Sequence, residues 1–165
     1  MRIPPAFDRT PLARRFWQDG RADDCPIVDC HGHMGSWNAI HFPLAEPAQM
    51  VRRMDRAGVR WLVFSHHASL SSPDQGNSPA VAAVRAFPDR LRAWCVVNPH
   101  YPDLVERDLA GFDAMRDVYA GLKLHAEMHA LPYTDPRYEH AWRFADERGL
   151  PVLAHTWGGS PRCGL

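Results

Sequence analysis

The chain has 165 residues, of which 45% are hydrophobic, with 19 basic and 19 acidic side chains. This is the composition of a globular protein, and the length suffices for one domain with a sizeable core. The zero formal charge gives no electrostatic reason for the protein to bind nucleic acid or an anionic membrane.

The apolar stretches and the cysteines bear on localisation. No stretch approaches the ~20 apolar residues of a membrane span, and the N-terminal residues contain no apolar core of a signal peptide. The four cysteines contain no CxxC pair, and a chain of this size does not need disulfides. We therefore expect a cytoplasmic protein.

The chain divides into a leader and a region of alternating patterns. Residues 1–25 are rich in proline and arginine, and we expect them to pack on the outside of the domain formed by residues 26–165. Short apolar runs in that domain predict strands at 26–33, 59–67, 91–99, 119–129 and 150–159. Segments with helical spacing and caps between the runs predict helices at 46–58, 78–87, 103–115 and 135–149.

This alternation predicts an α/β fold with βαβ crossovers and a parallel sheet that is covered on both faces. Such a sheet is either doubly wound or curled into a barrel. No glycine-rich phosphate-binding motif follows any strand, which removes the usual reason for a doubly wound sheet. We therefore expect a parallel (βα) barrel of the TIM type, incomplete because it contains about five of the eight βα units.

Histidines stand where a barrel carries its functional residues, at the carboxyl ends of the strands. His31 and His33 end the first strand, and a period of two places Asp29, His31 and His33 on one face. Two neutral imidazoles there can bind a divalent metal, although HxH alone fits a tight polar turn at Gly32 equally well. His155 ends the fifth strand, across the barrel from the first, and its presence favours a metal site.

Several stretches resemble the amidohydrolase superfamily; in chain order they are VDCHGHMG, MDRAGV, VNP, GLKLH and DPRYEHAWRFADERGLPVLAHTW. The resemblance covers residues 26 to about 158. It is greatest to the amidohydrolase-related branch, which contains metal-dependent hydrolases and decarboxylases of the aminocarboxymuconate-semialdehyde type. HxH by itself is a weakly specific motif. The resemblance is strong because GxKxH and the fifth-strand histidine follow HxH in the order that the family has.

The resemblance implies that His31, His33 and His155 are ligands of one divalent metal ion, with Zn²⁺ the first choice and a second ion as an alternative. It also implies a role for Lys123, either as a carbamylated bridge to a second metal or as a cation for a substrate carboxylate. No residue of this chain matches the catalytic base of the family, an aspartate at the end of the eighth strand.

Other polar residues near the strand ends are candidates for supporting roles. His125 either orients the substrate or bonds a neighbouring loop. Asp29 bonds either an imidazole N–H or the backbone. His66 and His67 are expected to line the pocket or to lie at the surface.

The implied activity is that of a metal-dependent hydrolase, which acts on a small cyclic or acyl substrate (amide, ester or lactone) through a metal-activated water. The alternatives are a metal-dependent non-oxidative decarboxylase of the same family and a non-catalytic half barrel that depends on assembly. A metal-dependent deoxyribonuclease fits less well, because it would need a glutamate in place of Lys123 and a basic surface.

The chain is shorter than the ~250 residues of a complete barrel. Its first and fifth strands would then be open sheet edges, which favour association. We expect a homo-oligomer or a complementing chain to cover these edges, and a small-molecule substrate as the other partner.

The isolated 165-residue chain should therefore bind divalent metal weakly and turn over little substrate. Metal titration and a hydrolase assay of the purified monomer measure both quantities. Full hydrolase activity of the monomer would contradict the expectation of an incomplete barrel.

Overall fold

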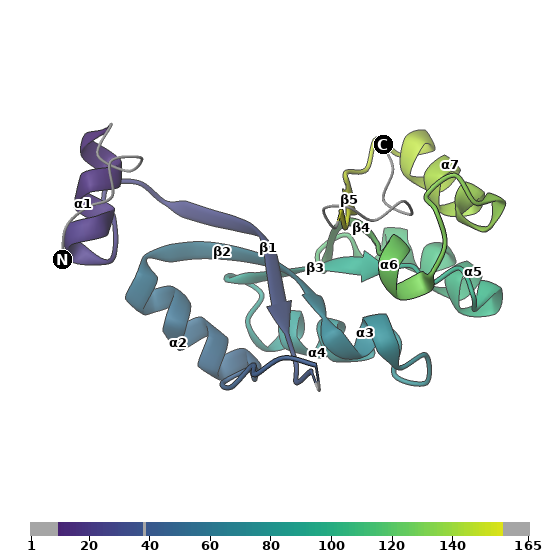
Figure 1. Cartoon of the computed structure of the whole chain (residues 1–165), viewed down its shortest axis with the longest axis horizontal. Coiled ribbons are helices and arrows are strands. Elements are labelled where there is room, and N and C mark those ends of the chain that lie inside the picture. Colours follow the sequence, from purple (N-terminus) through teal and green to yellow (C-terminus); the bar gives the residue numbers. More distant parts are fainter. Residues whose placement is uncertain (1–9, 38, 157–165) are drawn as a thin grey trace.

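The structure is a computed structural model of the chain, and it describes residues 10–37 and 39–156. Figure 1 shows its α-helices, 3-10 helices (η) and strands, which are in chain order α1 (Pro11–Asp19), β1 (Ile27–Met34), α2 (Pro47–Ala57), β2 (Val59–His66), α3 (His67–Ser71), α4 (Ser78–Ala86), β3 (Leu91–Val96), α5 (Pro102–Ala110), η1 (Phe112–Met115), β4 (Tyr119–Leu124), α6 (Ala126–His129), η2 (Pro136–Tyr138), α7 (Glu139–Glu147) and β5 (Val152–Ala154).

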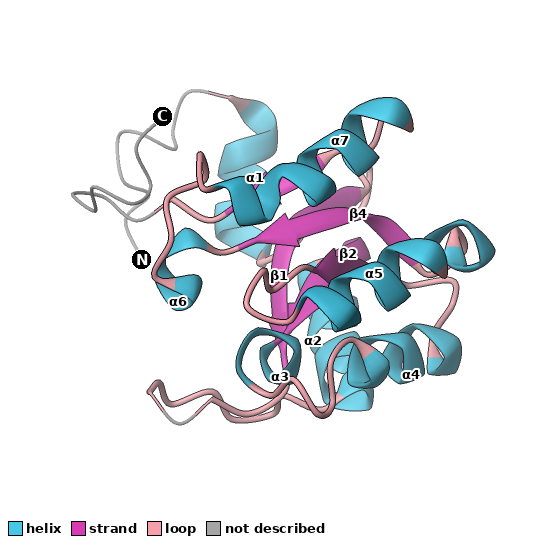
Figure 2. Ribbon diagram, turned by 90° about the vertical axis from the view of Figure 1, so that its right-hand side faces the viewer, coloured by secondary structure: helices cyan, strands magenta, loops and turns pink. Residues whose placement is uncertain are grey.

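The strands form one five-stranded sheet in the order β1-β2-β3-β4-β5, and every neighbouring pair is parallel. Helices join each strand to the next, and Figure 2 shows the strands in the centre with the helices around them. The predicted α/β class and the incomplete (βα) barrel are confirmed.

The hydrophobic core lies between the sheet and these helices. Phe64 of β2 and Leu122 and Leu124 of β4 are fully buried in it, and α2 contributes Val51 and Met54. Removing one such side chain from water contributes roughly 1.5–3 kcal/mol. This burial explains why the strands are apolar almost without interruption, as the sequence predicted.

The other face of the curled sheet is concave, and Trp94 of β3 lies on it. Ala93 and Cys95 belong to the core, so alternation along the strand turns Trp94 to the concave side. The indole Nε1 donates a hydrogen bond to the carbonyl of Cys30 in β1 at 3.0 Å. The same ring lies against β4, because a Cβ built on Gly121 would be 2.9 Å from Trp94 Cζ3. The side chain of Trp94 therefore contacts both β1 and β4.

The structure corrects the ends of two predicted strands. The run 59–67 is a strand only to His66, and the short helix α3 begins at the next residue. The run 119–129 is a strand only to Leu124, and α6 follows His125. In both places a histidine side chain accepts a backbone N–H of the following turn, which starts a helix where the sequence pattern shows only an apolar run with polar residues after it.

Three further predicted boundaries differ from the structure. The predicted helix 103–115 is divided at Gly111 into α5 and η1. The predicted helix 135–149 begins as η2 and continues as α7. The predicted strand 150–159 is represented by the three residues of β5, and its residues 157–159 lie outside the described residues.

The described part of the leader contains α1. The Thr10 side chain caps its start by accepting the Ala13 N–H at 3.1 Å, and Gly20 ends it in the left-handed conformation. Figure 1 shows α1 at one end of the molecule, and no α1 residue is buried. The division into a leader and a barrel domain stays a prediction, since residues 1–9 and 157–165 are not among those described. No helix of the described residues is both long and apolar enough to cross a membrane.

The close approach at Gly121 gives a test of the packing around Trp94. We predict that Gly121→Ala lowers the free energy of unfolding by about 2–3 kcal/mol, because the added methyl group would overlap the Pro151 carbonyl and the Trp94 ring. Urea denaturation measures this change. Gly111→Ala is the matched control: nothing lies closer than 3.5 Å to its added Cβ, so stability should change little. Equal midpoints for Gly121→Ala and the wild type would contradict the packing described for Trp94.

Candidate metal centre and adjoining cavity

The first predicted ligand pair lies at a bulge in β1. Asp29 is in register with Leu62 of β2 and Gly32 with Phe64, so β1 has one residue more than β2 between these points. Inside the bulge the Asp29 carboxylate accepts the backbone N–H of His31 at 2.9 Å. The bulge interrupts the strict alternation from which Asp29 was placed on the face of both histidines, and of the two predicted roles of Asp29 the structure shows the bond to the backbone.

The imidazoles of His31 and His33 lie close together at the end of this bulge. Their ring centroids are 5.3 Å apart, with the planes tilted by 41°. Two imidazoles bound to one tetrahedral metal at ~2.0–2.1 Å place their centroids about 5 Å apart, so the pair fits a shared ion. The Nδ1 atom of His33 is buried and has no hydrogen-bond partner among the described residues. Such an unsatisfied ring nitrogen is suited to a metal ligand.

The third predicted ligand, His155, follows β5. Its backbone N–H donates to the Leu124 carbonyl at 3.0 Å, which extends the pairing with β4. Its ring stacks on His125 with centroids 3.8 Å apart. Within residues 10–37 and 39–156, no group of three His, Cys, Asp or Glu side chains is already placed to hold a metal ion. That His31, His33 and His155 share one ion therefore stays a prediction.

These imidazoles are neutral at pH 7. Burial lowers the pKa of His33 to about 4 and that of His125 to about 3, and it also lowers the pKa values of His31 and His155. The charge of Lys123 lowers the pKa of each of these four rings as well. The four histidines and the lysine therefore surround one region, and each neutral ring has a lone pair for a metal or a proton.

Lys123 lies in β4, in register with Val96 of β3 and Leu153 of β5, and it is fully buried. Its Nζ atom has no hydrogen-bond partner among the residues described. Burial lowers the pKa of this ammonium group to about 8. Keeping an unpaired cation inside a protein is costly, so a lysine here is better explained by chemistry than by packing.

An open cavity of about 650 Å³ adjoins the histidines. Its polar wall consists of His33, His67, His125, His155 and the acidic Glu127. Its remaining lining is largely apolar and includes Trp37, Ile40, Phe42, Leu70 and Met128. An apolar cavity with a few convergent polar groups is typical of a site for a small molecule.

The adjacent histidines His66 and His67 differ in role. His66 caps α3, where its Nδ1 accepts the Ala68 N–H at 3.2 Å. His67 lines the cavity, and its Nδ1 donates to the Gly35 carbonyl at 2.6 Å. The His67 ring stacks on His33 with centroids 5.0 Å apart. His67 therefore supports one face of a predicted metal ligand, a role that the sequence did not reveal.

The sequence reading also missed Ser65, Trp37 and Phe42. Ser65 is fully buried and in register with His33, and its Oγ has no hydrogen-bond partner among the described residues. The period of two in β2 could have identified this residue, because it points away from the core that holds Phe64. Trp37 and Phe42 line the cavity from the loop after β1, where no periodic pattern exists to find them.

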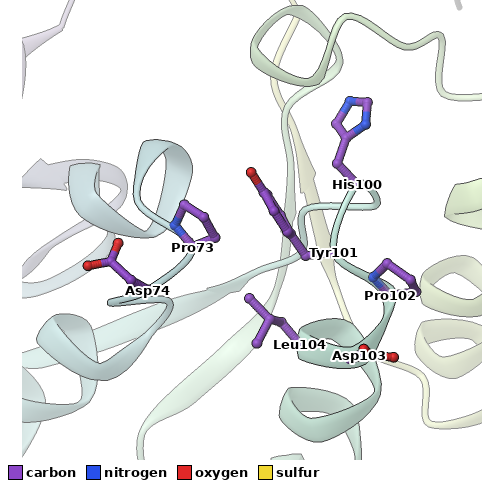
Figure 3. A pocket seen from close by; sticks show the side chains of 7 residues that line it. All are labelled: Pro73, Asp74, His100, Tyr101, Pro102, Asp103 and Leu104. Atoms are coloured by element: carbon purple, nitrogen blue, oxygen red, sulfur yellow. The ribbon is translucent and has the colours of Figure 1, made fainter.

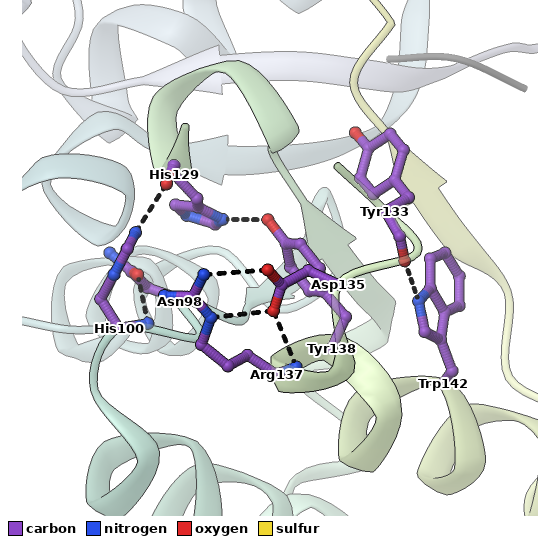
Figure 4. A network of polar contacts seen from close by, with 8 residues as sticks. All are labelled: Asn98, His100, His129, Tyr133, Asp135, Arg137, Tyr138 and Trp142. Atoms are coloured by element: carbon purple, nitrogen blue, oxygen red, sulfur yellow. Dashed lines mark hydrogen bonds and ion pairs between the residues drawn. The ribbon is translucent and has the colours of Figure 1, made fainter. Parts of the chain in front are cut away.

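Figure 4 shows a polar network that holds α6 in place. Met128 of α6 lines the cavity. The His100 Nε2 donates to the His129 carbonyl at 2.6 Å, and the His129 Nδ1 is 2.6 Å from the Tyr138 hydroxyl. The Tyr133 hydroxyl donates to the His155 carbonyl at 2.6 Å. These bonds tie α6 and the end of β5 to the layer of helices.

A second groove, of about 490 Å³, lies between the loop before α4 and the loop after β3 (Figure 3). Its lining residues are Pro73, Asp74, His100, Tyr101, Pro102, Asp103 and Leu104. None of these seven side chains has a buried polar atom without a partner. This contrast with His33, Ser65 and Lys123 places the candidate site on the concave face.

Comparisons with known proteins agree with this architecture. No protein-family model matches the chain, and no curated protein sequence matches it. Among solved structures, the chain is similar to a probable 2-pyrone-4,6-dicarboxylic acid hydrolase from Acinetobacter baumannii, with 18% identity over 80% of this chain and 50% of that one and a TM-score of 0.56.

Two decarboxylases are also similar. The 5-carboxyvanillate decarboxylase from Novosphingobium aromaticivorans, in a complex with manganese and a nitrobenzoic acid, has 14% identity over 91% of this chain and 39% of that one, with a TM-score of 0.55. The 2,6-dihydroxybenzoate decarboxylase from Rhizobium has 14% identity over 83% of this chain and 52% of that one, with a TM-score of 0.56. The chain spans about half the length of these structures or less. At such identities the likeness shows the fold.

Because His129 is buried, we predict that the folded protein loses stability in acid. Burial lowers its pKa from 6.5 to about 4, so the unfolded chain takes up a proton first as the pH falls. Stability from this residue is complete above pH 6.5 and is lost between pH 6.5 and 4, by about 3 kcal/mol. His129→Asn keeps a polar partner for Tyr138 and should remove about this much of the pH dependence.

Urea midpoints measured at pH 4 and pH 7 test this prediction. The exposed His41→Asn is the control and should retain the wild-type pH dependence. A His129→Asn protein that loses as much stability in acid as the wild type would contradict the described burial.

Proposed function

We propose that the chain belongs to the amidohydrolase superfamily and forms part of a metal-dependent hydrolase that acts on a small cyclic or acyl substrate. The pairing of His31 and His33 carries this proposal: their centroids are 5.3 Å apart, and the Nδ1 of His33 is buried without a partner among the described residues. The similar hydrolase and decarboxylases support it at the level of the fold.

In this proposal His31 and His33 hold a divalent metal together with His155. Zinc suits imidazole donors, and manganese is present in one similar structure, so both are candidates. A bound divalent ion supplies a water of lowered pKa and polarises the carbonyl of a substrate. The neutral state of the three imidazoles favours binding, because no proton has to leave before the ring nitrogen coordinates.

The other residues of the site would bind and orient the substrate. The apolar wall with Trp37, Phe42 and Leu70 would seat a hydrophobic part of the molecule and exclude water around it. His125 contacts the ring of His155 and would face the substrate from its position between β4 and α6. Lys123 would act either as a bridge to a second metal, after carbamylation, or as a cation for a carboxylate.

A non-oxidative decarboxylase of the same fold is the second candidate. The buried Lys123 in β4 and the largely apolar cavity, which His125 lines two residues further along the chain, would suit a substrate that carries a carboxylate on a hydrophobic ring. Two of the similar structures described above are decarboxylases by name, of 5-carboxyvanillate and of 2,6-dihydroxybenzoate. Single-turnover reactions with protein in excess distinguish the candidates: a hydrolase transfers ¹⁸O from water to its product, whereas a decarboxylase releases carbon dioxide.

The proposal also covers the cellular compartment of the protein and the partner chain at its sheet edges. Cys25, Cys30 and Cys95 are free thiols, which supports a reducing compartment such as the cytoplasm. β1 and β5 are the outer strands of the sheet, and Val28 of β1 is 53% exposed. A second copy or a complementing chain that covers these strands would protect the sheet edges.

Metal binding is the direct test of the histidine pair. We predict that the His31→Ala/His33→Ala variant binds Zn²⁺ at least about tenfold more weakly than the wild type in calorimetric titration, because two ligands are lost. His140→Ala is the control, since this histidine lies on α7 and pairs with Glu106. Equal affinities of the double variant and the wild type would refute the proposed centre.

A further inference from the structure

Glu127 is the one carboxylate on the wall of the cavity of about 650 Å³, and among the described residues no lysine or arginine lines this cavity. Lys123, whose charge acts on the neighbouring histidines, is not one of the lining residues. Burial lowers the pKa of each lining imidazole, so these rings are neutral at pH 7. The described part of the cavity wall therefore carries a negative formal charge.

Glu127 lies in the short helix α6 and is half-buried. Its neighbours His125 and Met128 also line the cavity, and the His125 side chain accepts the Met128 N–H at 3.3 Å, which fixes the start of α6. Burial lowers the pKa of His155, and the charge of Glu127 opposes this shift. The carboxylate therefore acts on the part of the cavity where the rings of His125 and His155 stack.

The rest of the lining is apolar and partly aromatic. Trp37 and Phe42 pack on the ring of His67, with centroids 5.0 and 5.3 Å from it. Ile40 and Met128 line the cavity as well and are 56% and 40% exposed, so apolar surface is present there for a ligand to cover. Aromatic rings attract organic cations through the negative faces of their π-systems. Both the charge and the lining of the cavity therefore suit a cation with a hydrophobic body.

We propose that this cavity selects a substrate that carries a cationic amino group on a hydrophobic body, and that Glu127 determines this specificity. A carboxylate offers about four acceptor sites, so Glu127 can accept ammonium N–H groups of a ligand in addition to its contacts within the protein. The cavity has room for one ring with its substituents.

This inference rests on the proposed function, because it names the substrate class of the same cavity. It favours the hydrolase over the decarboxylase as the function of the site. A carboxylate on the substrate would meet the like charge of Glu127 at the cavity wall, whereas an amino group on an amide or ester substrate would meet an opposite charge.

Three ligands of similar shape test the charge preference at pH 7: benzylamine is cationic, benzyl alcohol is neutral and benzoate is anionic. The readout is the Met128 methyl resonance of the full chain labelled with ¹³C at the methionine methyl groups, which Met128→Leu assigns. We expect benzylamine to shift this resonance saturably, with about tenfold higher affinity than benzyl alcohol, and benzoate to bind most weakly. Equal affinities for benzylamine and benzyl alcohol, tighter binding of benzoate, or no shift with any ligand would overturn the proposal.

Two glutamate variants locate the charge. Glu127→Gln keeps the shape of the side chain and should lower the affinity for benzylamine about tenfold, to that for benzyl alcohol. Its affinity for benzyl alcohol should stay unchanged, which shows that the cavity is intact. Glu106→Gln is the matched control, because Glu106 is exposed on α5 and pairs with His140. A retained benzylamine preference in Glu127→Gln, or an equal loss in Glu106→Gln, would overturn the assignment of Glu127.

The titrations are made without added metal, and Zn²⁺ binding by the wild type is measured separately. A wild type that binds Zn²⁺ but does not prefer benzylamine would refute the selectivity of the cavity and leave the metal centre standing. A wild type that prefers benzylamine through Glu127 but binds no Zn²⁺ would support the cation site and refute the metal centre.

Discussion

The indole of Trp94 fixes the curl of the sheet on which the candidate site depends. Its Nε1 bonds the carbonyl of Cys30 in β1, and its ring lies against Gly121 in β4. β4 is the direct neighbour of β3, whereas a flat parallel sheet would keep β3 and β1 apart, because β2 lies between them. The curl brings the end of β1 toward the ends of β4 and β5. Polar residues from distant parts of the chain then face one region.

Within that region, and among the described residues, several polar atoms are buried without the hydrogen bonds that burial normally requires. Buried polar atoms are normally hydrogen-bonded, yet His33, Ser65 and Lys123 each keep an unsatisfied buried atom within the described part of the chain. All three lie on the concave side, whereas the convex side is an apolar core. The hydrophobic core therefore stabilises a surface that is itself unfavourable without ligands. Bound metal and substrate would satisfy these atoms, and binding of either one would stabilise the fold.

Much of the architecture could be predicted from the sequence, because strands that are covered on both faces are apolar runs and the helices between them show periodic spacing. His31, His33 and His155 could be grouped in advance, since all carboxyl ends of parallel strands lie at one edge. The bulge at Asp29 could not be predicted, because one extra residue in a strand leaves no pattern. The short helices after His66 and His125 were missed for a related reason: each begins at a side-chain cap, without helical periodicity.

The roles of individual residues were harder to predict than their grouping. Ser65 looks like any serine in a strand until register pairs it with His33. Lys123 was recognised by its motif, but its complete burial without a partner among the described residues appears only in three dimensions. The assignments of His155 as a ligand and of Lys123 as a cation or bridge stay predictions.

Anomalous X-ray diffraction from a crystal of the full chain soaked in Zn²⁺ tests the central claim most directly. The account predicts a zinc peak on the concave face, within bonding distance of a ring nitrogen of both His31 and His33. A map in which zinc binds only elsewhere, with the His33 ring free of metal, would contradict it.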